Sequence, residues 1–495
     1  MPLHTLRRPV ALACLGALTA LGLAGCVSIP ADHTPPGKTA PHAIPASLAA
    51  IGAADIRLAR DGWPDANWWQ AYGDPQLDAL IAAALASSPS LDAAAARIAQ
   101  AQSVQAHAAA EGGLAAGVTG NANRQRYSAT GLLPAPIGGS WFTEASVRIE
   151  TRYDFDWWGK HKAQVAAAAG DVQARRAELA QAERALAAAL AQSYFRLQGG
   201  WAHRANLALR MAAQRDVIAD TEKRVAHGLA VADEARRAQA DLALLARDAA
   251  AIDGANLHER EALRALAGGA GAAGLIASLA PRALPAAAPA LPSQLGMELL
   301  ARRPDLQAAR WRVEASLNRI DAARAAFYPD IDMAAGIGLN TISLERLLTL
   351  PSRTFMAGPS IALPLFDSKL LAAQLDSARQ QRNALVADYN QAVLDAVRMV
   401  AQDAATVQAF DGQLSEQQAA IAVLSTQLAT VQRRVDAGLS GRRAALDAQL
   451  TLLGLQDQQL QLRQAQALAH VALIHTLGGG YQAAPLSVPA LSQHP

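Results

Sequence analysis

RVAHGLA, residues 224–230, and RVDAGLS, residues 434–440, are two copies of one short pattern, and their glycines, Gly228 and Gly438, lie 210 positions apart. Long segments rich in alanine and leucine flank each copy and are typical of helices. Glycine takes left-handed backbone angles at little cost, so it commonly ends a helix where the chain turns back. Each copy therefore predicts the tip of a helical hairpin.

The similarity extends beyond the two tips. Leu242 corresponds to Leu452 at the same offset, and further upstream Pro89 corresponds to Pro304. Internal similarity over about half the chain indicates a tandem duplication. We divide the chain accordingly into a first repeat, a connector rich in glycine and proline, a second repeat and a C-terminal tail, at residues 63–268, 269–293, 294–478 and 479–495.

The composition favours long helices over a thick globular core. Only 4% of the 495 residues are aromatic, and abundant alanine lets helices pack closely. Helices are predicted from 160 to about 225 and from 369 to about 435, each about 100 Å long at ~1.5 Å per residue. In the second repeat, apolar residues follow coiled-coil steps of three and four. The seam also contains three polar residues, Asp403, Asp457 and Gln464. The pattern leaves open whether they line a pore, set the register of the helices or are merely solvated.

The N-terminus has the pattern of a bacterial lipoprotein signal. Two arginines precede a short apolar run that ends in Leu-Ala-Gly before Cys26. The pattern predicts a signal peptide over residues 1–25, an acylated Cys26, and a proline-rich extended linker over residues 26–62. Val27, where aspartate would retain a lipoprotein in the inner membrane, points to the outer membrane. The alternatives are a signal with an incidental cysteine and a membrane helix, for which the run is short.

The charge balance argues against a nucleic-acid partner. Removal of residues 1–25 takes two arginines and no acid, which leaves 42 basic and 42 acidic residues. A nucleic-acid-binding protein would usually carry a basic excess.

Four segments alternate with period two and predict strands. Val147 and Ile149, for example, alternate with Arg148 and Glu150, so one face of the strand is apolar and the other charged. Strands of about ten residues can cross a bilayer at a tilt, but four cannot close a barrel. Because unpaired edges are unfavourable in hydrocarbon, other copies of the chain must complete the sheet. The alternative is a soluble periplasmic sheet with one wet face. The four segments are residues 114–126, 143–154, 330–340 and 355–365.

The sequence contains no motif that predicts an enzyme. HExxH, CxxC, GxSxG and a complete phosphate-binding loop are all missing from the sequence. His470 and His475 are five residues apart, a spacing unsuited to one metal ion on a helix, and they are interpreted as ordinary residues of a helix face. We therefore expect no enzymatic activity, no metal and no cofactor apart from the lipid on Cys26, an N-acyl diglyceride with palmitate.

Several motifs occur together in a fixed order: the lipoprotein signal, GDPQLDALI at 73–81, YDFDWWGK at 153–160, LPLFDSK at 363–369 and the two tips. In this combination the chain resembles the TolC/OprM outer membrane efflux proteins, and most of all their NodT-type lipoprotein branch. The resemblance covers nearly all of the mature chain.

The resemblance implies a mixed α and β membrane protein. Each chain of a homotrimer would give four strands to an outer-membrane β-barrel, and its helices would continue this barrel as a long periplasmic α-helical barrel. Such channels are passive exit ducts for drugs and small toxic compounds. They dock through a periplasmic adaptor protein onto an inner-membrane transporter of the RND type. Two rival interpretations remain, a periplasmic coiled-coil scaffold lipoprotein without a pore and a lipoprotein hydrolase, for which the sequence lacks a nucleophile motif.

Functional residues follow from the resemblance by position. The residues that match adaptor-docking tips are Arg224, Gly228, Leu229, Arg434, Gly438 and Leu439. Asp447 matches an acidic residue that rings the closed periplasmic end, where three like carboxylates would repel one another or bind cations. Arg443 lies four residues before it, so it is expected to pair with Asp447 or with Glu234 of a neighbouring copy. These three residues form the predicted gate.

Overall fold

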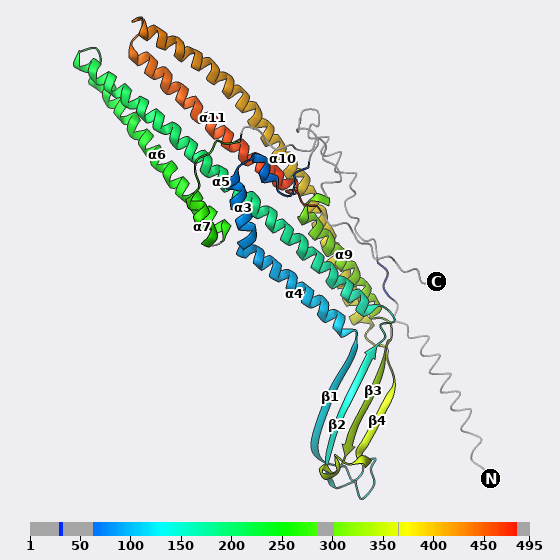
Figure 1. Cartoon of the computed structure of the whole chain (residues 1–495). Coiled ribbons are helices and arrows are strands. Elements are labelled where there is room, and N and C mark those ends of the chain that lie inside the picture. Colours follow the sequence, from blue (N-terminus) through cyan, green and yellow to red (C-terminus); the bar gives the residue numbers. More distant parts are fainter. Residues whose placement is uncertain (1–28, 33–62, 269, 286–300, 365, 483–495) are drawn as a thin grey trace, which may run out of the picture. The chain divides into compact units, whose positions relative to one another are not determined.

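The computed structural model describes residues 29–32, 63–268, 270–285, 301–364 and 366–482 (Figure 1). The predicted signal peptide, Cys26, most of the linker and residues 483–495 of the tail lie outside this part of the chain. The chain divides into two compact units. The sheet unit comprises Met1–Gly37, Ile98–Ala174 and Ala309–Asp388, and the helical unit comprises Lys38–Arg97, Arg175–Ala308 and Tyr389–Pro495.

The sheet unit contains one antiparallel sheet of four strands in the order β1-β2-β3-β4 (Figure 1). All four predicted strands are confirmed, with ends that differ by up to three residues from the prediction. The last strand ends at Ala362, three residues before the predicted end. The strands are β1 Leu114–Arg126, β2 Trp141–Asp154, β3 Asp330–Thr341 and β4 Arg353–Ala362.

The register of the strands separates an apolar face from a polar one. Val118, Ile149, Ile337 and Phe355 follow one another across the four strands and therefore lie on the same face. Each of these side chains is at least half exposed in the single chain, as a lipid-facing surface would be. The opposite face carries most of the charged residues, including Arg152, which forms an ion pair with Asp332 across β2 and β3.

The YDFDWWGK motif connects β2 to the first long helix. Asp156 has a φ of +45°, and its carboxylate accepts the backbone N–H groups of His161 and Lys162, both at 2.9 Å. These bonds satisfy donors that the first turn of a helix leaves unpaired. The ring of Trp158 stacks on Tyr328 at a centroid distance of 4.6 Å. The motif thus fixes the angle at which the chain leaves the sheet.

Long helices make up most of the chain, and two pairs of them form hairpins, α5 with α6 and α10 with α11 (Figure 1). The long helices predicted from 160 and from 369 are confirmed with ends within one residue or so. The α-helices are α3 Pro75–Ser87, α4 Pro89–Glu111, α5 Lys160–Ala226, α6 Ala232–Ala267, α7 Ala270–Ala277, α9 Pro304–Ala325, α10 Ser368–Asp436 and α11 Arg442–Thr476, and the short 3-10 helices are η1 Trp68–Tyr72, η2 Leu344–Arg346 and η3 Leu350–Ser352.

The core of the helical unit gathers around Tyr194 of α5, which is fully buried together with Leu77 and Leu80 of α3. Its hydroxyl donates to Asp74 Oδ2 at 2.5 Å, and burial raises the pKa of Tyr194 above its usual value. The segment Pro75–Glu111 is apolar enough to span a membrane by composition. It is two helices, and α3 serves as a core helix of this unit.

Part of the segment expected to be only a connector is folded. Residues 270–277 form α7, and Ile276, Leu279 and Leu284 join the core of the helical unit. Gln198 of α5 holds the segment that follows α7, because its side chain donates to Ala280 O at 3.1 Å and accepts the N–H of Arg282 at 2.6 Å. Packing against α3 and α5 therefore orders a stretch whose glycine content disfavours a helix.

For Asp457 the solvated interpretation of the polar seam is wrong, because its side chain is packed against α5. Asp457 of α11 is buried and forms ion pairs with His203 at 2.9 Å and Arg210 at 3.7 Å, both on α5. Gln464 donates to the backbone oxygen of Arg196 at 3.1 Å, also on α5. A buried carboxylate needs such partners, and the pairing fixes how α11 lies against α5.

Asp403 of α10 is partly buried and His470 of α11 is buried. Thr476 Oγ1 donates to Asp403 at 3.0 Å, and burial raises the pKa of Asp403. His470 is almost fully buried and is not an ordinary surface residue of its helix. Burial lowers its pKa, since the charged imidazolium is poorly solvated inside the unit.

Candidate gate and docking tips

The two tips have the same backbone geometry. Gly228 has a φ of +68° and Gly438 of +70°, so both adopt the left-handed conformation expected from the sequence. In both tips a backbone N–H reaches back five residues at 2.7 Å, from Leu229 to Arg224 O and from Leu439 to Arg434 O. These bonds cap the last turns of α5 and α10. The duplication is therefore retained at the level of individual hydrogen bonds.

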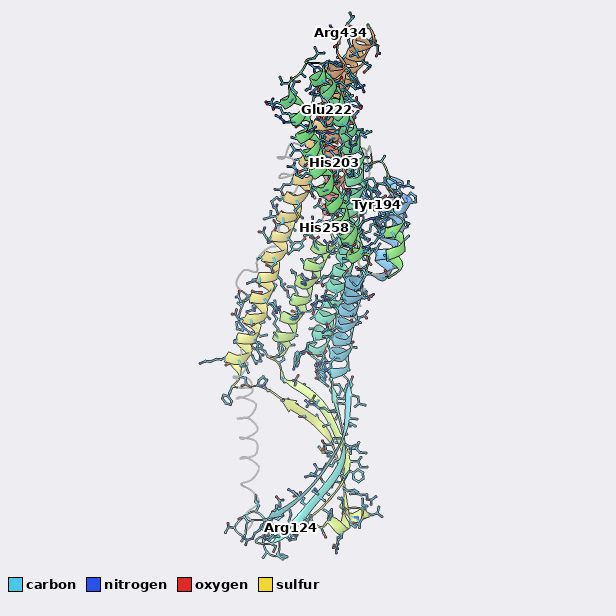
Figure 2. All side chains as sticks on the ribbon, turned by 90° about the vertical axis from the view of Figure 1, so that its left-hand side faces the viewer. Arg124, Tyr194, His203, Glu222, His258 and Arg434 are labelled. Atoms are coloured by element: carbon cyan, nitrogen blue, oxygen red, sulfur yellow. The ribbon has the colours of Figure 1, made fainter. Side chains whose placement is uncertain are left out.

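Each tip presents an apolar side chain to solvent. Leu229 is 69% exposed and Leu439 is 73% exposed. Arg224 and Arg434 lie in the last turns of the helices that lead into these tips, and Figure 2 shows Arg434 at the end of α10. An exposed leucine at a hairpin end, beside arginine, is suited to contact a partner protein.

Arg443 of α11 forms the central contact of the predicted gate. Its Nε lies 2.8 Å from Asp447 Oδ1 and 2.9 Å from Oδ2, so the expected pairing with Asp447 within one chain is present. Its Nη1 donates to Thr221 Oγ1 of α5 at 3.0 Å. Thr221 is fully buried and donates in turn to Val217 O at 2.7 Å. Arg443 therefore ties the second hairpin to the first.

An apolar cluster lies beside this polar contact. Val217 of α5, Ala238 of α6 and Leu446 of α11 are buried against one another. Arg442 adds a looser ion pair, 3.9 Å from Asp216 of α5, between exposed side chains. The cluster keeps the two hairpins in contact, and Arg443 sets their alignment.

Glu234 does not take part in this contact within one chain. It lies exposed in the first turn of α6, and no ion pair joins it to Arg443 in the part of the chain that the structure describes. Its assignment to the gate depends on a neighbouring copy and stays a prediction. The role of Thr221 could not be predicted from the sequence, because 222 residues separate it from Arg443 and no local pattern marks it.

The energies of these contacts differ in size. The ion pair between Arg443 and Asp447 is half-exposed, and exposed pairs at this spacing contribute only about 0.3–0.5 kcal/mol. A hydrogen bond from a charged donor into a buried site is stronger, about 1.5–3 kcal/mol. The bond to Thr221 is thus the stronger tie of the two. Within the described residues no group of acidic, histidine or cysteine side chains is arranged to hold a metal ion.

Comparison with known proteins agrees with this architecture. The model of the family described as "Outer membrane efflux protein" matches residues 80–269 and 295–479, so the chain belongs to that family. The family is one of transport channels and not of enzymes. The predicted fold class, a trimeric outer-membrane barrel with four strands from each chain and a helical continuation, is confirmed, as is the outer membrane location.

Individual relatives cover almost the whole chain. The Multidrug resistance outer membrane protein MdtP of Shigella flexneri is 38% identical over 95% of this chain and 96% of its own length. The crystal structure of the outer membrane protein VceC from Vibrio cholerae is similar with a TM-score of 0.75 at 31% identity, covering 85% of this chain and 100% of that one. The CmeC outer membrane channel of Campylobacter jejuni shares the fold, with a TM-score of 0.79 at 17% identity, over 92% of this chain and 95% of its own.

Proposed function

We propose that this channel is the passive exit duct of a tripartite pump that expels drugs and other small toxic compounds. Relatives of similar length carry multidrug resistance in their names. The observation that supports the proposal best is the combination, in one chain, of a sheet with one apolar and one charged face and two helical hairpins with exposed tips. Transport through such a duct needs no bond chemistry and no cofactor.

The tips would dock a periplasmic adaptor, which joins the duct to an inner-membrane transporter of the RND type. Leu229 and Leu439 offer two apolar contacts in the same local geometry. A partner that recognises one tip could therefore recognise the other in the same way, with Arg224 and Arg434 beside the leucines for hydrogen bonding.

The gate would consist of Arg443, Asp447 and, from a neighbouring copy, Glu234. In a trimer three Asp447 carboxylates would repel one another, and each Arg443 would offset this repulsion. Opening would require the second hairpin to move away from the first, which breaks the bond between Arg443 and Thr221. Replacement of Arg443 should therefore favour the open state.

The path of residues 29–32 supports a lipid anchor on Cys26. Asp32 pairs with Arg382 of α10 at 2.9 Å, and this hydrogen-bonded pair lowers the pKa of Asp32. Ile29 packs with Leu371 and Leu375, which lie closer to the start of the same helix. Followed from Asp32 back to Ile29, the chain thus runs along α10 toward the start of this helix, which follows β4. Because three residues span at most about 10 Å, an N-acyl diglyceride and palmitate on Cys26 would lie near the helix start, next to the membrane strands.

Two measurements would test the proposed function. The first is growth on several antibiotics of a strain that lacks its own efflux channel, with and without this chain. Restored resistance would support the exit-duct role. The lipid anchor has its own test, since Cys26→Ser should lose incorporation of labelled palmitate. The second is single-channel conductance in a planar bilayer. Asp447→Ala removes the ion pair that orients Arg443 toward Thr221, so small, flickering steps in the native protein and larger ones in this variant would support a gated duct. Silent bilayers with both proteins would favour the scaffold alternative.

A further inference from the structure

The apolar face of the sheet carries only three charged side chains among its strand residues. The register places Arg124 opposite Thr143, Arg126 opposite Trp141 and Arg353 opposite Leu339, on the same face as Ile149 and Ile337. All three are arginines, and no acid lies on this face of any strand. The opposite face holds both signs, with the acids Glu144, Glu150, Asp154, Asp330 and Asp332 beside Arg148 and Arg152.

These arginines lie together at one end of the sheet. Arg126 is the last residue of β1, Arg124 is one pleat further in, and Arg353 is the first residue of β4. Figure 2 shows Arg124 close to the connections between the strands, away from the end at which the helices join the sheet. Because those helices are periplasmic in this fold class, the arginine end of the sheet faces the cell surface.

None of the three guanidinium groups forms an ion pair with an acid in the part of the chain that the structure describes. Arg126 donates from Nε to Gly139 O, and Arg353 donates from Nε to Leu350 O, both at 3.0 Å. These bonds use one edge of each guanidinium, which leaves the Nη groups for another acceptor. All three side chains are exposed in the single chain.

A charge on the lipid-facing side of a barrel is strongly unfavourable at the middle of the bilayer and nearly harmless at its interfaces. The three arginines therefore mark the level of the outer headgroups. Trp141, directly opposite Arg126, is 60% exposed on the same face, and exposed tryptophan is typical of the same level. An all-positive set at this depth is complementary to lipid phosphates and not to acyl chains.

The arginines also lie on the two edge strands, β1 and β4. Closure of a trimeric barrel places β1 of one subunit beside β4 of the next. Each of the three junctions would then gather Arg124 and Arg126 with the partner subunit's Arg353, so a single chain contains only part of the cluster.

We propose that this outer rim cluster binds the phosphate groups of an outer-leaflet glycolipid of the lipid A type, one at each subunit junction. Arginine is suited to the task, since its planar fork binds phosphate oxygens by paired charge-assisted hydrogen bonds. The bound lipid would link adjacent subunits on the membrane side, independently of what the duct transports. This role is separate from the proposed efflux function and from the lipid on Cys26.

The test uses detergent-purified, delipidated trimers and native mass spectrometry with defined lipid A. Wild-type trimers should bind bisphosphorylated lipid A at least about tenfold more tightly than the fully dephosphorylated form. The triple variant Arg124→Gln/Arg126→Gln/Arg353→Gln should lose this preference. Arg148→Gln, on the inner face of the same sheet, should retain it and serves as the matched control.

Three results would overturn the proposal. They are equal binding of the two lipid forms by the wild type, an unchanged preference in the triple variant, and full competition by millimolar inorganic phosphate, which would show a site for the free anion instead. The comparison of lipid forms needs no variant, so it decides the question even if the triple variant does not assemble. Since lipid binding is measured on isolated trimers, a failure of the efflux proposal would leave the result unchanged.

Discussion

The two hairpin tips share one turn and differ in the helix that follows it. After the first tip, the first turn of α6 carries Asp233 and Glu234, whereas after the second, α11 begins with Arg442 and Arg443. Acids near a helix N-terminus are favourable and bases are unfavourable there. The charges of the first helix start are therefore favourable, whereas those of the second are unfavourable and are offset by contacts with α5. The two tips thus have the same backbone geometry, but only the helix after the second tip is hydrogen-bonded to α5 through Arg443.

The charged residues that follow the tips differ between the two repeats. At the offset of the two glycines, Arg443 stands opposite Asp233, and Asp447 stands opposite Arg237. The signs of the charges are exchanged between the repeats at both positions. The two tips thus share a turn but differ in the charges around it, and only the second carries an arginine that reaches a hydroxyl of α5.

The largest effect on antibiotic resistance is expected from the exposed leucine that both tips share. Leu229→Asp and Leu439→Asp together should reduce antibiotic resistance to the level of a strain without the channel, because a charge replaces each apolar contact with the adaptor. Minimum inhibitory concentrations and cross-linking to the adaptor would measure this. Leu229→Met/Leu439→Met is the control that keeps the apolar contact. Normal resistance in the double aspartate variant would show that docking does not use the tips.

The next largest effect is expected from loss of the hydrogen bond between Arg443 and Thr221, which only the second tip has. Arg443→Ala should raise single-channel conductance and the leakage of large antibiotics into cells, since it removes the bond to Thr221 and leaves Asp447 without its cation. Asp233→Ala, at the matching place of the first repeat, should leave both unchanged. Equal effects of the two substitutions would mean that the tips do not differ in function.

A smaller effect is expected when only the acceptor is changed. Thr221→Val keeps the volume of the side chain but removes its hydroxyl. Combined with Arg443→Ala in a double-mutant cycle, it should show a coupling of about 1 kcal/mol in the free energy of unfolding. Thermal or denaturant unfolding of the trimer measures this. Strictly additive changes would show that the hydrogen bond between Arg443 and Thr221 contributes nothing to stability.

The smallest effect is electrostatic. Arg442→Glu should stabilise α11 by about 0.3–1 kcal/mol at low salt, because it places an acid at the helix N-terminus. The ion pair between Arg442 and Asp216, at 3.9 Å between exposed groups, contributes little to stability, so its loss should cost little. Glu234→Lys should destabilise α6 by a similar amount. Unfolding curves at low and high salt would test both, and a salt-independent difference would exclude the dipole explanation.

Much of the fold could be predicted because its patterns are local. The alternation around Ile149 located β2 to within two residues, and the glycine patterns located both tips. Residues 270–277 were missed as a helix, because two glycines weaken the local signal and only the burial of Ile276 against α3 and its neighbours compensates. Local sequence does not contain such a contact.

In the predicted gate, too, contacts within one helix could be predicted from the sequence and contacts between repeats could not. The spacing of Arg443 and Asp447 was enough to predict their pairing, since both are on one helix. The contact with Thr221 joins residues from different repeats, and no property of either residue reveals it. For Asp457, similarly, the sequence showed a polar seam position but not the two basic partners on α5 that decide its burial.

The central strands of the sheet come from different repeats. Thr151 of β2 donates to Ala335 O of β3 at 3.2 Å across 184 residues of chain. A two-stranded hairpin is marginal alone, and contacts this distant in sequence form slowly. During biogenesis the β1–β2 hairpin must therefore wait until the second repeat has crossed the inner membrane. Chaperones in the periplasm would meet a chain whose helices are ready to fold while its membrane strands are still unpaired.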